Sequence, residues 1–211
     1  MAQYFEVHPD NPQARLLKQA AALIQGGGVV ALPTDSCYAL VCQLDDKRAV
    51  DQLRRIRQMD ERHHLTLMCR DLSELATYAR VNNTQYRLLK LGTPGPYTFL
   101  LDASKEVPRR VSHPSRKSIG LRVPQHAVAQ ALLDAHGGAL LCATLMLPGD
   151  DEALNDAHDI RERLEHDLAA VIDAGACALT PTTVIDLTPM ATQGEPEVVR
   201  QGAGDLATLG L

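Results

Sequence analysis

Hydrophobic residues recur along the chain in two patterns, one helical and one extended. One helical face is formed by four residues at the required spacing, Leu16, Ala20, Leu23 and Ile24. Asn11 and Pro12 stand where such a helix begins, because an Asn side chain can cap free amides and proline suits the first turn. The glycines at 26–28 form a stop signal. The apolar run 29–32 then has the length of a buried strand.

The same alternation continues through the rest of the sequence. Helices are expected at 47–58, 71–79, 83–91, 126–136 and 157–166. Strands are expected at 3–7, 65–69, 97–102, 118–123, 139–145, 169–173, 182–187 and 196–200. Because helices and strands alternate before strands dominate the last third, we expect one α/β (α+β) domain over 1–211 with a mixed sheet. Glycine, proline and acidic content make 148–157 and 188–196 the expected mobile loops.

Composition fits a chain that folds in a reducing compartment. With 211 residues and 45% hydrophobic content, it buries enough apolar surface to need no disulfide or metal. The five cysteines are scattered, without CxxC spacing, at Cys37, Cys42, Cys69, Cys142 and Cys177. The N-terminus lacks a signal-peptide pattern, and no apolar run approaches the length of a membrane span. We therefore expect a cytoplasmic protein without a membrane partner.

Positive charge is gathered in two places although the net charge is −5. The segment 105–122 carries +5, which leaves −10 for the rest, and its basic residues are Lys105, Arg109, Arg110, Arg116, Lys117 and Arg122. A second cluster contains Arg54, Arg55, Arg57, Arg62, His63 and His64. Each cluster taken alone can be explained as a solvated surface, and the two histidines are expected to be mostly solvated. Two clusters on an acidic chain still favour a polyanionic partner, either a nucleotide or RNA.

Polar side chains directly follow the predicted strand at 29–32. Thr34, Asp35 and Ser36 place two hydroxyls and a carboxylate at the carboxyl end of this strand, where open α/β sheets bind ligands. A capped turn is the alternative, since Asp and Ser often bond their own backbone. Two other predicted strand ends carry polar residues that could bind a ligand. Thr182 and Thr183 stand at the start of one strand, and Arg122 stands at the end of another. The glycines at 26–28 lack phosphate-loop spacing, and the acidic run 150–152 suits a surface loop better than a Mg²⁺ site.

Five motifs in sequence order together resemble the YrdC/YciO family. PTDSCYAL at 33–40 is similar to the family's PTDTVYGL, and PGPYTFLL at 94–101 to its PGPxTxxL. SIGLRVP at 118–124 resembles its strand ending in RxP. PTTVIDLT at 181–188 and VVRQG at 198–202 resemble its STVVDxT and closing RxG segments. The resemblance covers about residues 12–204.

This resemblance implies a fold and a reaction. The fold is the YrdC type, a twisted open mixed sheet with flanking helices and a large, positively lined concave surface. The reaction joins L-threonine, bicarbonate and ATP into threonylcarbamoyl-adenylate with release of pyrophosphate, which leads to threonylcarbamoyl modification of a tRNA adenosine. Because the protein must mainly position substrates and neutralise phosphate charge, Arg and Lys donors with Mg²⁺ are expected.

The resemblance also assigns residues. Those implied to contact threonine or its carbamate are Thr34, Thr66, Arg122 and Thr182. Those implied to contact ATP are Arg57, Ser118, Thr144 and Arg200. Arg122 suits a carboxylate, because the planar guanidinium fork matches it bidentately. No catalytic residue is assigned.

Two methionines depart from the synthase pattern and resemble the YciO branch. Family synthases carry a KxR pair and an SxN pair, where this chain has Arg57 with Met59 and Thr144 with Met146. Each lost charge-assisted hydrogen bond is worth about 1.5–3 kcal/mol, so synthase activity is expected to be weak or altered. The alternative is a module for duplex RNA or tRNA, because 3% aromatic content without Trp disfavours stacking on single strands.

Overall fold

The computed structural model describes residues 1–60, 63–109, 111, 115 and 117–211. Within these residues the strands form one ten-stranded mixed sheet, as the sequence predicts. The strands are β1 (Gln3–Glu6), β2 (Val30–Leu32), β3 (Ala39–Gln43), β4 (Thr66–Met68), β5 (Tyr97–Asp102), β6 (Ser118–Arg122), β7 (Leu140–Thr144), β8 (Ala170–Asp173), β9 (Thr183–Asp186) and β10 (Glu197–Arg200).

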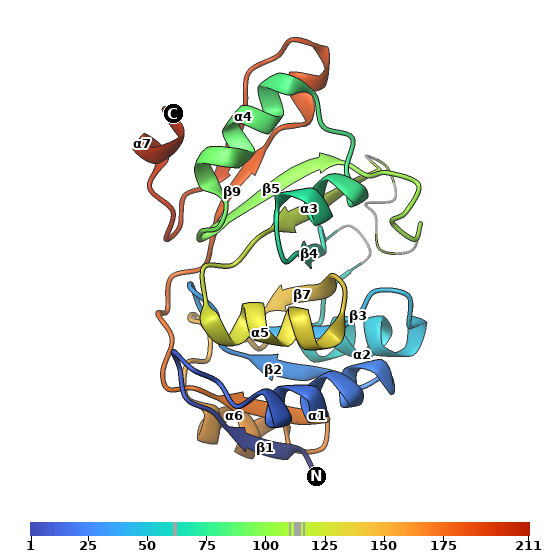
Figure 1. The fold of residues 1–211 in the computed structure, drawn as a ribbon, viewed down its shortest axis with the longest axis vertical. Helices are drawn as coiled ribbons and strands as arrows, with labels where there is room; N and C mark the ends of the chain where they lie inside the picture. The colour runs from blue at the N-terminus through green and yellow to red at the C-terminus, as the bar shows by residue number, and fades with distance from the viewer. Residues whose placement is uncertain (61–62, 110, 112–114, 116) are drawn as a thin grey trace.

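The sheet joins segments that are distant in sequence. Its strand order is β1-β8-β2-β3-β7-β4-β6-β5-β9-β10, which runs from the lower to the upper part of Figure 1. The pairs β1–β8, β2–β8, β4–β6 and β5–β9 are parallel, and the others are antiparallel. The N-terminus lies at the lower end, and the C-terminal helix lies beside the upper half.

Helices connect the strands at nearly the predicted positions. They are α1 (Ala14–Gln25), α2 (Lys47–Arg57), α3 (Leu72–Tyr78), α4 (Asn83–Gly92), α5 (Ala127–His136), α6 (Ala157–Leu164), the 3₁₀ helix η1 (Thr188–Thr192) and α7 (Leu206–Leu209). Local sequence explains their ends. The Asn82 side chain accepts from the Gln85 amide, and the Gln85 side chain accepts from the Asn82 amide, which makes a capping box at the start of α4.

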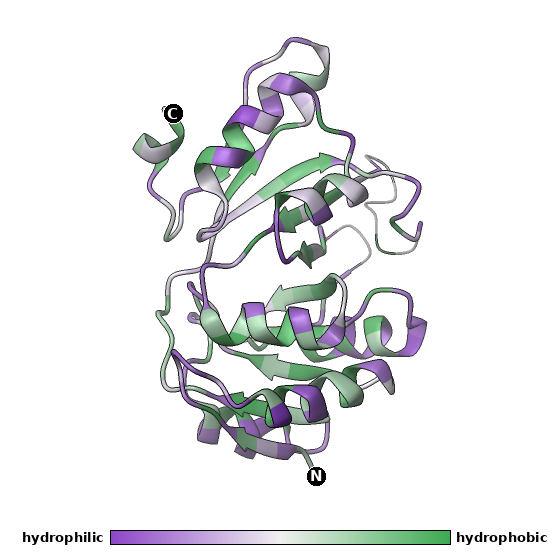
Figure 2. Cartoon of the chain, viewed as in Figure 1, coloured by the Kyte–Doolittle hydropathy of each residue, from purple (hydrophilic) through white to green (hydrophobic). Residues whose placement is uncertain are grey.

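Hydrophobic side chains fill both faces of the sheet. Val41 and Leu140 belong to one cluster with α1 and α5, whereas their neighbours Leu40 and Leu141 belong to another with α2, α3, α4 and α6. Because successive side chains of a strand point to opposite faces, α1 and α5 cover one face, and α2, α3, α4 and α6 pack on the opposite one. Figure 2 shows the strands as mostly hydrophobic and the helices as mixed.

The structure differs from the sequence prediction at four places, one of which is the short C-terminal helix α7, absent from the prediction. The predicted cap by Asn11 is wrong, because α1 begins at Ala14 and the preceding Gln13 makes no side-chain cap bond. Strand β3 is absent from the prediction. Its residues are apolar like those of β2 and follow them after a short polar turn, so no clear signal separates the two strands. Part of the expected mobile loop at 188–196 is η1.

No helix among the described residues is long and apolar enough to cross a membrane.

The glycines at 26–28 do end α1, with Gly27 in a left-handed conformation at φ +87°.

Gly202, in the closing VVRQG motif, allows two backbone segments to touch. A Cβ atom at this position would lie 2.1 Å from the Pro181 carbonyl oxygen and 2.6 Å from the Thr182 carbonyl carbon. The Gly202 amide also donates to the Thr183 hydroxyl at 2.9 Å. The glycine is therefore required by close packing against the segment that carries Thr182.

We predict that Gly202→Ala lowers the free energy of unfolding by about 1–3 kcal/mol, because the added methyl group overlaps backbone atoms that have little room to move. Urea denaturation measures the loss. Gly138→Ala is the matched control, since a Cβ there meets nothing within 4 Å. Equal stability of the two variants would contradict this packing account.

Candidate functional site

Strand registers place most of the predicted ligand residues on one face of the sheet. Thr66 lies opposite Gly120, so it shares a face with Ser118 and Arg122, which are two residues to either side of that glycine. Thr66 also lies opposite Cys142, two residues before Thr144. This is the face that α1 and α5 cover elsewhere, because Met68 and Cys142 belong to their cluster.

The far part of the same face continues through β5, β9 and β10. Thr98 and Arg200 both lie opposite Val184, and the Thr98 hydroxyl is 2.9 Å from the Thr182 hydroxyl. Six of the eight predicted residues, all except Thr34 and Arg57, therefore share this face. Beyond β7 the face changes from hydrophobic to polar, which is where a ligand would be held.

Ser118 and Arg122 mark the length of the polar region along β6. At about 3.3 Å per residue, their Cα atoms are about 13 Å apart. Ser118 is buried, and its hydroxyl is 3.0 Å from Nε2 of His64. The expectation that His64 is mostly solvated is therefore wrong, because its ring is half-buried against β6.

The turn after β2 is held by its own side chains. The Thr34 hydroxyl donates to the Cys37 carbonyl at 2.7 Å and accepts from the Ser36 amide at 3.3 Å. The capped-turn interpretation thus describes Thr34 and Ser36, which are both buried. Asp35 behaves differently, since its carboxylate leaves the turn and reaches β6.

Asp35 and Arg122 form a buried ion pair between Oδ1 and Nη2, with side chains 9% and 6% exposed. The second carboxylate oxygen of Asp35 accepts from the Gln125 amide at 3.0 Å. Nη1 of Arg122 lies 3.5 Å from the Ser36 hydroxyl. Nε of Arg122 is buried and has no hydrogen-bond partner among the described residues. The guanidinium is therefore anchored at both terminal nitrogens, and each of them carries one further N–H.

Three arginines from three elements, Arg57, Arg122 and Arg200, interact electrostatically with Cys37. Burial raises the pKa of the Cys37 thiol, whereas the Ser36 hydrogen bond and the charges of Arg122 and Arg200 oppose this rise. Burial also lowers the pKa of Arg57 and Arg200, and both interact electrostatically with Cys37. Because removing a charge from water is unfavourable, these cations favour an anionic partner.

The other predicted residues are partly engaged by the protein. The Arg200 guanidinium donates from Nη2 to the Thr182 carbonyl at 2.9 Å and from Nε at 3.3 Å. Nε of Arg57 is buried and lacks a partner among the described residues. Three arginines against one aspartate leave an excess of two positive charges. The family resemblance assigns no ligand contact to Asp35, Thr98 or His64, which meet Arg122, Thr182 and Ser118 only through the tertiary fold.

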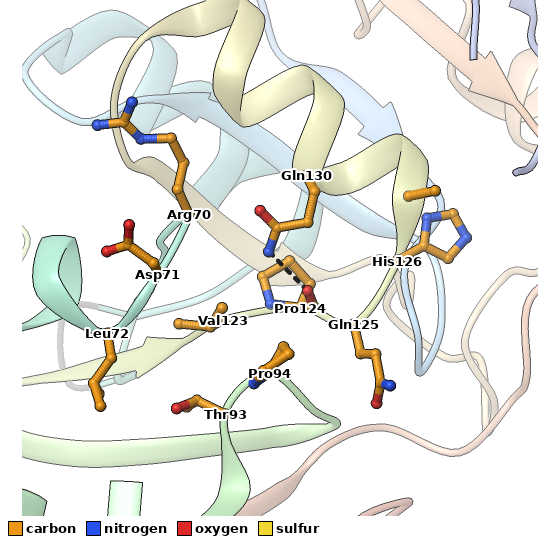
Figure 3. Close-up of a pocket in the computed structure, with 11 residues that line it drawn as sticks. Arg70, Asp71, Leu72, Thr93, Pro94, Val123, Pro124, Gln125, His126 and Gln130 are labelled. Carbon is orange, nitrogen blue, oxygen red and sulfur yellow. Dashed lines mark hydrogen bonds between the residues drawn. The ribbon is translucent and has the colours of Figure 1, made fainter. Parts of the chain in front are cut away.

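A cavity lies next to this face. It has a volume of about 480 Å³ between the N-terminal ends of α3 and α5 and the Thr93–Pro94 turn (Figure 3). None of the eight predicted residues lines it. It borders the site through the loop that follows Arg122, where the Gln130 side chain donates to the Pro124 carbonyl at 2.9 Å. A concave surface lined by the predicted residues remains a prediction.

Two further predictions concern charge and metal. Of the predicted basic clusters, Arg62, Arg110 and Arg116 lie outside the described residues. The described part of the chain contains no group of three His, Cys, Asp or Glu side chains that could hold a metal ion. The Asp35 carboxylate is already bonded to Arg122 and Gln125. The site geometry thus suits a ligand with anionic oxygens rather than a metal held by protein side chains.

Fold and site together define an α/β protein with an arginine-rich polar face on a mixed sheet. A family model for the Sua5/YciO/YrdC proteins, described as "Telomere recombination", matches residues 22–202. The chain belongs to this family. It is 50% identical over 206 residues to the "Uncharacterized protein YciO" of Escherichia coli K12, with 98% of each chain covered. It is 33% identical over 157 residues to the threonylcarbamoyl-AMP synthase of Alkalilimnicola ehrlichii, which covers 74% of this chain and 81% of that one.

Solved structures share the fold. The crystal structure of E. coli YciO matches with a TM-score of 0.94 and 50% identity, covering 99% of this chain and all of that one. The structure of P. abyssi Sua5 complexed with L-threonine matches with a TM-score of 0.85 at 24% identity. That match covers 94% of this chain and 57% of Sua5. The fold that the motifs imply is therefore confirmed.

Proposed function

We propose that this chain binds ATP and L-threonine on the polar face and catalyses threonylcarbamoyl-adenylate formation weakly or in altered form. The main support is the set of three arginines, Arg57, Arg122 and Arg200, which all interact electrostatically with Cys37 and would supply the positive charge that phosphates and a carboxylate need. Relatives named threonylcarbamoyl-AMP synthase and a Sua5 structure complexed with L-threonine support the choice of substrates. The product would serve tRNA modification.

In the proposed reaction, the amine of L-threonine first captures carbon dioxide from bicarbonate as a carbamate. A carbamate oxygen then attacks the α-phosphorus of ATP, and the bond to the β-phosphate oxygen breaks to release pyrophosphate. The chain would contribute by positioning and by neutralising charge. Arg122 would face the threonine carboxylate with Thr34, Thr66 and Thr182 nearby. Four residues would face ATP, namely Arg57, Ser118, Thr144 and Arg200.

Mg²⁺ in this proposal arrives as part of the nucleotide substrate. Mg²⁺ commonly binds through substrate phosphates and water rather than through an all-protein cage. This fits the described residues, which offer no cluster of metal ligands. Bicarbonate and ATP are likewise proposed as substrates on the family resemblance.

We predict that millimolar ATP with Mg²⁺ and L-threonine raises the thermal stability of the chain, by about 2.7 kcal/mol at 100 times the dissociation constant. Arg57→Gln should remove most of this gain, because its half-buried guanidinium lacks another partner among the described residues. Differential scanning calorimetry measures the effect. The control is Arg87→Gln on the exposed side of α4. An unchanged melting temperature with every ligand would refute the proposed binding.

The two methionines explain why activity is proposed to be weak. Met59 follows α2 and packs against the hydrophobic core, and the Met146 amide donates to the Thr144 carbonyl at 3.0 Å. Both therefore lie within two residues of a predicted ATP contact, Arg57 or Thr144. Neither thioether offers the charge or the amide that family synthases place there.

Met59→Arg combined with Met146→Asn should raise pyrophosphate release about tenfold or more, since each restored charge-assisted hydrogen bond is worth about 1.5–3 kcal/mol. Pyrophosphate is measured with L-threonine and bicarbonate each omitted in turn. The matched control, Met59→Leu with Met146→Leu, keeps both side chains apolar. A gain in neither double variant would show that these methionines do not limit the reaction.

Duplex RNA or tRNA is the second candidate ligand. The observation in its favour is the exposure of Lys105, Arg109 and Lys117 in the described part of the basic segment. Lys117 immediately precedes β6, so these cations lie at the Ser118 end of the polar face. In this proposal the phosphate backbone, rather than the bases, supplies recognition.

If RNA is the ligand, its affinity should fall linearly with salt concentration on a logarithmic plot, because phosphate contacts release counterions. Lys105→Gln with Lys117→Gln should reduce that slope by about 0.9 for each lost phosphate contact. Fluorescence anisotropy with a duplex RNA measures it. Lys18→Gln with Lys47→Gln provides exposed control substitutions. Salt-insensitive affinity would exclude backbone recognition.

A further inference from the structure

Asp35 contacts the polar face at Arg122, although the family resemblance assigns no ligand contact to it. Its carboxylate joins the β2–β3 turn to Arg122 at the end of β6 and to the Gln125 amide at the start of the next loop. The ion pair is buried on both sides, so water does not compete strongly for it. One side chain therefore fixes two segments that meet at the site.

The contacts of Arg122 show what this fixation does. Nη2 bonds Asp35, and Nη1 lies 3.5 Å from the Ser36 hydroxyl. A planar guanidinium held at both terminal nitrogens has a defined orientation, and each of these nitrogens carries a second N–H beyond the one used by Ser36 or Asp35. The bidentate carboxylate clamp expected of Arg122 is thus already partly used by Asp35. Because Nε is itself buried, a ligand would bind these terminal N–H groups.

We infer that Asp35 is a positioning residue: it orients Arg122 so that the terminal N–H groups not bonded to Asp35 or Ser36 are presented to the carboxylate of an amino-acid ligand. This inference rests on the proposed function, because L-threonine is the ligand assigned to Arg122. A pre-oriented donor loses less side-chain freedom on binding, which increases affinity without any new contact. Asp35 therefore acts on the amino-acid end of the site and much less on the ATP end, which Arg57 and Arg200 serve.

Asp35 also has an electrostatic effect on ligand affinity that opposes its effect on orientation. It neutralises Arg122, so its removal leaves a stronger positive charge that attracts a carboxylate at long range. Orientation should dominate, because Arg122 is buried and a guanidinium without its anchor turns toward any remaining acceptor. The two effects predict opposite changes in affinity, which makes them separable.

The test uses isothermal titration calorimetry of the full chain with L-threonine and, separately, with ATP and Mg²⁺. Asp35→Asn should weaken L-threonine binding by about tenfold or more, with the affinity for ATP changed less than about threefold. Asp35→Glu, which keeps the charge, should recover part of the L-threonine affinity. The control Asp156→Asn removes a helix-capping carboxylate at α6 and should leave both affinities unchanged.

The possible outcomes distinguish failure of the proposed function from failure of the inference about Asp35. Failure of the unsubstituted chain to bind either ligand would overturn the proposed function and this inference with it. Binding by the unsubstituted chain with equal losses for both ligands in Asp35→Asn would overturn the inference alone, since it would indicate a purely structural role. Tighter L-threonine binding in Asp35→Asn would also overturn it, because Asp35 would then act only by neutralising Arg122.

Discussion

The alternation of side chains across the strands is the constraint on which the site depends. Because every second residue of a strand faces the same side, the registers of β7, β4, β6, β5, β9 and β10 bring Thr144, Thr66, Arg122, Thr182 and Arg200 to one face. α1 and α5 cover this face over the first part of the sheet. Where their cover ends, the face becomes polar and positively charged.

Buried charge makes this arrangement specific. Arg122 lies almost completely out of water, and an unpaired cation there would be strongly unfavourable. Asp35 compensates it and ties the turn after β2 to β6. Arg57 and Arg200 are only partly compensated by the protein, which leaves the face with a preference for anionic oxygens. Family membership is therefore consistent with the local electrostatics.

Much of the fold was predictable from sequence because its helices have clear apolar faces and its strands have turn signals between them. The ligand face was predictable only through the family motifs, since periodicity does not reveal which strands pair. Strand β3 was missed because it follows β2 after a short polar turn. The Asp35–Arg122 pair joins residues 87 positions apart, and the His64–Ser118 contact joins residues 54 apart, so neither had a local signal.

The most direct test of this account is a crystal structure of the chain grown with ATP, Mg²⁺ and L-threonine. The account predicts phosphate oxygens beside Arg57 or Arg200 and the threonine carboxylate beside the terminal nitrogens of Arg122, all on the polar face. Ligand bound instead in the cavity between α3 and α5, beside Pro94 and Pro124, would contradict it.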